Sequence, residues 1–115
     1  MGGAKDFFSY TEWNGDIITN PPYKDALSFV KHGLKIIPNG NKIAMFLKLQ
    51  FLEGKERGEF FLNYPPTKIY VSSRRLRCAK NGDFEKYSKC NAMAFAWFVW
   101  RKGYKGKPIV DWINL

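Results

Sequence analysis

The sequence predicts an α/β domain in which a mainly parallel sheet carries helices on its faces. Segments with strand and helix patterns alternate along the chain, which is typical of such sheets. Pro- and Gly-containing breakers separate the segments. The chain has 115 residues, of which 45% are hydrophobic; this suffices for one small domain with a core and excludes a disordered tail. We therefore expect a single domain over residues 1–115.

The first strand and helix are separated by two prolines. Residues 16–19 form a short β-branched run that ends at Asn20, Pro21 and Pro22, because proline cannot donate to a sheet ladder. Residues 24–37 have apolar side chains at helical spacing. Breaker residues at 38–40 end this helix.

Four more segments are expected to complete the sheet, with one weaker helix among them. Residues 42–49 are nearly continuously apolar, as in a strand covered on both faces. A weak helical pattern at 51–62 is followed by a strand at 68–72. Residues 92–100 are the most apolar run and predict a central strand, and 109–113 predict a last short one. Because no helix separates these final two strands, we expect an antiparallel hairpin at one edge of the sheet.

Charge and composition restrict the classes of binding partner that we expect. Lys and Arg total 19 against 10 Asp and Glu, and the resulting +9 falls entirely within residues 41–115. This excess favours a nucleic-acid partner, DNA in particular, although a solvated basic surface is the alternative. No apolar run approaches the ~20 residues that span a bilayer, so we expect a cytoplasmic protein with no membrane contact. Two cysteines and one histidine are too few for a structural zinc site, and we expect no metal.

The tetrapeptide Asn20-Pro21-Pro22-Tyr23 resembles the catalytic motif of the N6-adenine DNA methyltransferases that use S-adenosylmethionine. It follows a predicted strand and precedes a predicted helix, the context in which a short motif is informative. The resemblance implies a class I methyltransferase fold, a Rossmann-like three-layer sandwich. It also implies a reaction: methyl transfer to the exocyclic amino group of an adenine that is flipped out of DNA.

The chemistry of an amino group explains these residue types. The nitrogen of an exocyclic amine is a poor nucleophile because its lone pair is conjugated with the ring. The side-chain carbonyl of Asn20 and the backbone carbonyl of Pro21 can accept hydrogen bonds from its two N–H groups, which localises the lone pair. Pro22 restricts the turn, and Tyr23 offers an aromatic face to a flipped base. The residues that the resemblance places in the catalytic site are Asn20, Pro21, Pro22 and Tyr23.

The resemblance assigns further roles outside the tetrapeptide. Asp6 and Phe7 lie where the family contacts the adenine of the cofactor. Phe84, or Tyr87 in its place, corresponds to a second aromatic contact with the flipped base. The basic run predicts phosphate contacts, for which the candidates are Arg74, Arg75 and Arg77.

The sequence departs from the family in the cofactor-binding part. The glycine-rich loop after the first strand of the sheet is absent, and so is the acidic residue that holds the ribose. The chain thus resembles the catalytic half of a methyltransferase without its N-terminal glycine-rich half. We expect weak binding of S-adenosylmethionine by the chain alone, and a partner in the form of a separate N-terminal half or a second copy at the exposed edge of strand 16–19.

Other functions remain open at this level. If the chain is an enzyme, we expect a bacterial or phage-borne methyltransferase of the restriction-modification kind. The same tetrapeptide serves enzymes that methylate guanine in RNA or glutamine amides in protein. A non-catalytic nucleic-acid-binding subunit or remnant is the alternative from a different class.

Overall fold

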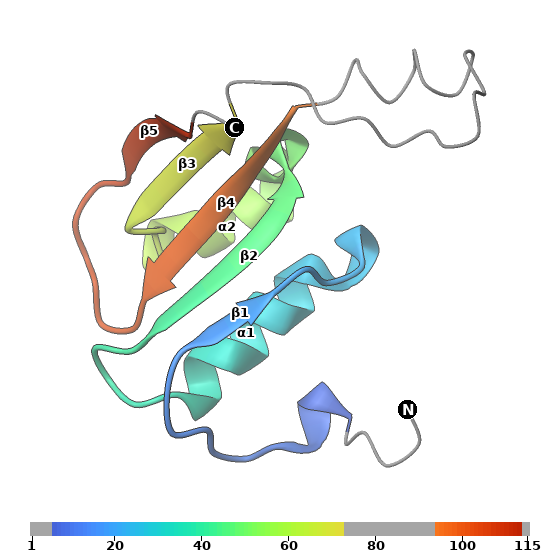
Figure 1. Cartoon of the computed structure of the whole chain (residues 1–115), viewed down its shortest axis with the longest axis vertical. Coiled ribbons are helices and arrows are strands. Elements are labelled where there is room, and N and C mark those ends of the chain that lie inside the picture. The colour runs from blue at the N-terminus through green and yellow to red at the C-terminus, as the bar shows by residue number, and fades with distance from the viewer. Residues whose placement is uncertain (1–5, 73–93, 114–115) are drawn as a thin grey trace.

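Five strands form one mixed sheet in the computed structural model, which describes residues 6–72 and 94–113 (Figure 1). The order across the sheet is β1-β2-β4-β3-β5. The strands are β1 (Ile17–Thr19), β2 (Lys42–Lys48), β3 (Lys68–Ser72), β4 (Phe95–Arg101) and β5 (Ile109–Ile113). The α/β class and all five predicted strands are confirmed.

The expected antiparallel hairpin at the sheet edge is wrong. β4 runs antiparallel to both of its neighbours, β2 and β3, and lies in the middle of the sheet. β5 does not pair with β4; it pairs with β3 in parallel, and the Ile109 amide bonds the Thr67 carbonyl at 3.1 Å at the start of this ladder. The apolar β4 takes the most covered position, so the last strand finds its free edge at β3. β1 pairs with β2 in parallel and forms the other edge, as expected.

Both helices lie on the same face of the sheet. These are α1 (Ala26–Ile36) and α2 (Lys55–Asn63), and short 3-10 turns lie at Phe7–Ser9, Tyr23–Asp25 and Leu49–Leu52. Burial along β2 alternates, so that Ile43, Met45 and Leu47 face the helices while the residues between them stay partly exposed. Among the described residues the domain therefore has two layers, and the expected three-layer sandwich is wrong for this part of the chain.

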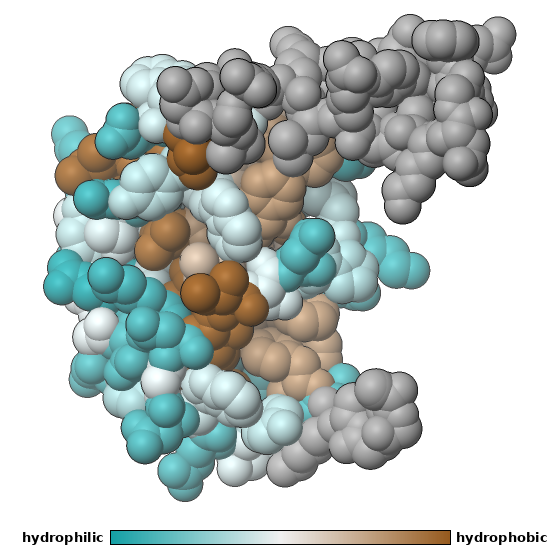
Figure 2. All heavy atoms as spheres, viewed as in Figure 1, coloured by the Kyte–Doolittle hydropathy of each residue, from teal (hydrophilic) through white to brown (hydrophobic). Residues whose placement is uncertain are grey.

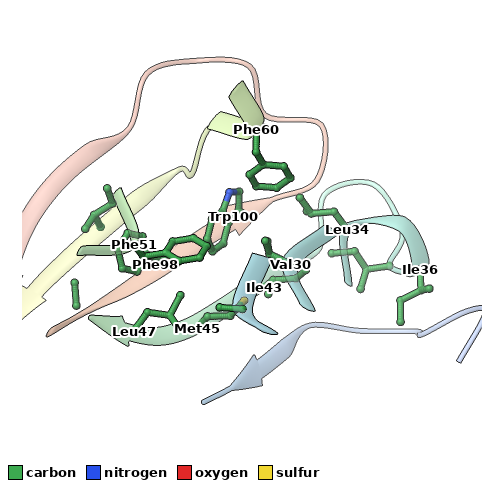
Figure 3. Packing of buried hydrophobic residues seen from close by; sticks show 14 residues of the cluster. Val30, Leu34, Ile36, Ile43, Met45, Leu47, Phe51, Phe60, Phe98 and Trp100 are labelled. Atoms are coloured by element: carbon green, nitrogen blue, oxygen red, sulfur yellow. The ribbon is translucent and has the colours of Figure 1, made fainter. Parts of the chain in front are cut away.

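The core lies between the helices and this face (Figure 3). Phe51 meets Phe98 and Trp100 edge-on, with ring centroids 5.5 and 6.3 Å apart. The buried indole N–H of Trp100 donates to the Tyr64 carbonyl at 3.0 Å. The buried apolar residues are Ala26, Val30, Leu34, Ile36, Ile37, Ile43, Met45, Leu47, Phe51, Phe60, Ile69, Ala96, Phe98 and Trp100.

The opposite face of the sheet, which we call the open face, carries apolar side chains that no helix of the described residues covers. Ile18 on β1 is 74% exposed. Phe46 stacks on Phe95 at 5.4 Å and tilts against Trp97 at 5.2 Å. In Figure 1 the strands lie in front of the helices, and in the same view Figure 2 shows brown apolar residues across the middle of the molecule. Such a face is more apolar than an ordinary solvated surface.

Asp16 joins β1 to β2 at the amino ends of both strands. Its carboxylate accepts the Lys42 amide and the Asn41 side-chain amide, each at 2.8 Å. The hydrogen bond from the Lys42 amide, helped by that from Asn41, holds the pKa of Asp16 below its ordinary value.

Candidate active site at the carboxyl edge of β1

The tetrapeptide begins directly after β1, as its pattern predicts. Asn20 follows Thr19, the last residue of the strand, and the chain then enters a 3-10 turn at Tyr23–Asp25 and helix α1. β1, β2, β3 and β5 run in the same direction, so their carboxyl ends meet at this edge of the sheet. This is where open α/β sheets bind ligands.

The two expected hydrogen-bond acceptors are the side chain of Asn20 and the backbone carbonyl of Pro21. Asn20 is exposed and Pro21 is buried. The Asp25 amide bonds the carbonyl of Pro22 at 3.0 Å, which closes the turn one residue beyond the acceptors. Within the described residues, neither the Asn20 side chain nor the Pro21 carbonyl has a hydrogen-bond partner. Neither acceptor is therefore committed to a partner there, and the exposed Asn20 side chain is open to a ligand.

The Tyr23 ring is half-buried and surrounded by groups from β2 and α2. The edge of its ring meets that of Phe51, with centroids 6.3 Å apart. The Lys48 ammonium lies 5.2 Å from the ring centroid and the Arg57 guanidinium 5.8 Å from it. The Tyr23 hydroxyl oxygen is buried and has no hydrogen-bond partner in the part of the chain that the structure describes. A stacked base would displace at least one of these two flexible cations from the ring.

Lys48 and Arg57 reach the ring from different elements. Lys48 is the last residue of β2, so its side chain leaves the sheet beside the end of β1. Gly54, with a φ of 109°, turns the chain into α2. A Cβ at Gly54 would lie 3.0 Å from the Arg57 guanidinium, and the Arg57 Nε donates to the Glu53 carbonyl at 2.5 Å. The sequence reading missed both cations; the signal for Lys48 is a base at the carboxyl end of a strand.

Of the two residues that the resemblance assigns to the cofactor, Phe7 lies against α1. Phe7 stacks on Phe29 with centroids 4.9 Å apart and planes within 4°. Asp6 is exposed, and its carbonyl accepts the amide and the hydroxyl of Ser9. His32 bonds the Tyr10 carbonyl at 2.9 Å, which fixes the same segment to the helix. Phe7 therefore packs on the helix that follows the tetrapeptide, and Asp6 precedes it in the chain with an exposed side chain.

The other expected site residues lie outside the described residues; they are Arg74, Arg75, Arg77 and Phe84. The described ranges contain no group of three His, Cys, Asp or Glu residues that could hold a metal ion. Over the same ranges, no helix has the length and hydropathy needed to cross a membrane.

No protein-family model matches the chain, and no curated protein is detectably similar to it.

Proposed function

We propose that the edge formed by Asn20–Tyr23 methylates an exocyclic amino group, with adenine N6 in DNA as the substrate and S-adenosylmethionine as the methyl donor. The observation that carries the proposal is a pair of acceptors, the Asn20 side chain and the Pro21 carbonyl, at the end of a parallel strand. They have no hydrogen-bond partner among the described residues, and the aromatic ring of Tyr23 follows them in the chain.

The chain's own residues would act on the amino group. Asn20 and Pro21 accept from its two N–H groups, hold the nitrogen in place and localise its lone pair. Tyr23 supports the plane of the base once a cation has moved from its ring. When bound, S-adenosylmethionine supplies an electrophilic methyl group. Its binding residues are proposed only as Asp6 and Phe7, because no described loop is a glycine-rich turn after a strand.

Lys48 and Arg57 favour a nucleic acid over a protein amide as substrate. Both cations lie within 6 Å of the Tyr23 ring centroid. A flipped nucleotide brings its phosphate close to its base, and Lys and Arg are the usual partners of phosphate. A glutamine amide would bring no such charge.

Transfer of a labelled methyl group tests the proposal. The chain is incubated with labelled S-adenosylmethionine and unmethylated DNA, RNA or protein, alone and with the product of the adjacent coding sequence. Asn20→Ala should lower transfer by about 100- to 1,000-fold, the cost of removing one essential hydrogen-bonding group. Asn20→Asp keeps an acceptor and should retain part of the activity.

Asn14→Ala is the matched control, because Asn14 is exposed and lies outside the motif. Nucleoside analysis of the product should find N6-methyladenine. Label in RNA or protein instead of DNA would leave the reaction but change the substrate. Absence of transfer to all three, or full activity of Asn20→Ala, would contradict the proposal.

A further inference from the structure

A second basic and aromatic surface lies at the other end of the strands from Asn20–Tyr23, where β4 ends and β2 begins. It is a cleft of about 660 Å³ between the C-terminal halves of α1 and α2 and the loop after β4. Trp100, Phe60 and Leu34 lie at its base, where Figure 3 shows them converging. Its size falls within the range of pockets that bind small organic molecules. We call it the α1–α2 cleft.

Positive charge dominates the α1–α2 cleft. Its lining includes five bases and no acid; the bases are Lys31, Lys35, Arg101, Lys102 and Lys105. The Glu56 carboxylate lies 3.9 Å from the Lys31 ammonium, and both side chains are more than half exposed. A pair this exposed is screened and leaves Lys31 largely available.

Two of these lysines neutralise the negative ends of the helices. The Lys102 ammonium donates to the Lys35 and Ile37 carbonyls at the end of α1, at 3.3 and 2.7 Å. The Lys105 ammonium donates to the Asn63 carbonyl at the end of α2, at 3.4 Å. Helix C-termini carry partial negative charge that would repel an anion, so capping them makes the cleft receptive to one.

Aromatic rings alternate with the cations. Tyr64 is 51% exposed, and the Lys105 ammonium lies 5.6 Å from its ring centroid. The Arg101 guanidinium lies 5.5 Å from the ring of Tyr104, and Phe60 stacks on Tyr64 at 5.3 Å. Tyr64 is thus the exposed ring of the cleft and Tyr104 a partly exposed one. Proteins bind single-stranded nucleic acid with cations beside accessible rings, because phosphates meet the cations and bases stack on the rings.

We infer that the α1–α2 cleft binds a segment of single-stranded nucleic acid. Lys31 and Lys35 lie one turn apart on α1, and Lys105 lies across the cleft at the end of α2. This spread suits successive phosphates of a strand better than a single free phosphate. The inference does not rest on the proposed methyl transfer, since the cleft and Asn20 lie at opposite ends of the strands.

Salt-dependent binding of a labelled oligothymidine tests the inference. The triple variant Lys31→Gln, Lys35→Gln, Lys105→Gln should lower the log–log salt slope by about 2, since each lost phosphate contact removes about 0.7 for a single strand. The matched control replaces Lys42, Lys55 and Lys68 with Gln; these exposed lysines lie outside the cleft, and the slope should change by less than half as much. Equal changes in the two triples would overturn the inference.

Stacking is tested separately from charge. Tyr64→Leu keeps an apolar neighbour for Phe60 and should weaken oligothymidine binding at least fivefold with an unchanged salt slope. Thermal unfolding of each variant establishes that it folds. Unaltered affinity in folded Tyr64→Leu, or binding of adenosine monophosphate as tight as that of the oligonucleotide, would overturn the strand assignment. Oligothymidine has no exocyclic amino group, so a failure of methyl transfer leaves this test intact.

Discussion

A matched pair of isoleucine truncations tests the two-layer arrangement. Ile43 on β2 is 1% exposed and faces the helices, whereas Ile18 on β1 is 74% exposed on the open face. The same substitution, isoleucine to alanine, thus removes the same atoms from a covered and an uncovered side of one sheet.

The expected costs follow from burial and packing. Truncating a fully buried isoleucine costs about 2–5 kcal/mol, depending on how far its surroundings can collapse. A Cβ on Gly33 would lie 2.5 Å from the Ile43 Cδ1, so the α1 backbone is already in close contact with this side chain. Rigid helix backbone cannot fill the cavity easily, which places Ile43→Ala in the upper part of that range. Ile18 keeps about a quarter of its surface buried, so Ile18→Ala should cost less than about 1 kcal/mol.

Urea denaturation measures the difference. With a slope of about 2 kcal/mol per molar urea, Ile43→Ala should lower the midpoint by about 1.5 M or more, and Ile18→Ala by less than about 0.5 M. Equal losses would refute the reasoning, because they would mean that the open face is covered as fully as the core face. Repeating the pair at two protein concentrations separates cover by a second copy from cover within the chain.

Three further outcomes are expected. Folding lowers the pKa of Asp16, so this residue stabilises the fold above its unfolded pKa of about 4 and loses that effect as the pH falls below it. The difference in urea midpoint between Asp16→Asn and the natural protein should therefore shrink between pH 7 and pH 3. A difference that stays constant would contradict this. The short edge strand β1 and the exposed Ile18 predict self-association, measurable by light scattering and reduced by Ile18→Lys, whereas a monomer at high concentration would count against it. Gly54→Ala should destabilise the protein by about 1–2 kcal/mol, because the φ of Gly54 is 109°. Gly58 lies within α2 with open space around it, so Gly58→Ala should stabilise the protein by up to about 1 kcal/mol. Thermal unfolding would detect the opposite signs.

Local pattern predicts the elements of this sheet well. The strands at 68–72 and 109–113 have the predicted bounds, and the apolar run ending at Trp100 is a central strand. Breakers and β-branched residues act over a few positions, so a sequence window contains the information needed.

Strand order and layer number could not be predicted in the same way. The absence of a helix between the last two strands favoured a β4–β5 hairpin, but the free edge that β5 meets belongs to β3. Ala44 and Phe46 make β2 look apolar throughout, although they lie on the open face. Which face receives a helix depends on chain connections rather than on the strand itself.

In the candidate site, too, local sequence predicts some features, whereas others depend on the fold. The position of Asn20–Tyr23 after a strand follows from local pattern, and the structure has it there. The cations at the Tyr23 ring arrive from β2 and α2, and the turn at Gly54 that directs Arg57 is not visible as a contact in the sequence. The expected roles of the four motif residues stay predictions.

The central position of β4 has a consequence for synthesis on the ribosome. Met45 of β2 pairs with Phe98 of β4, 53 positions later in the chain. At translation rates of about 5–20 residues per second, the inner edge of β2 waits roughly 3–10 seconds for the strand that covers it. During that interval a nascent chain exposes an apolar ribbon to chaperones, and a codon change that slows elongation between these strands should lower the yield of folded protein.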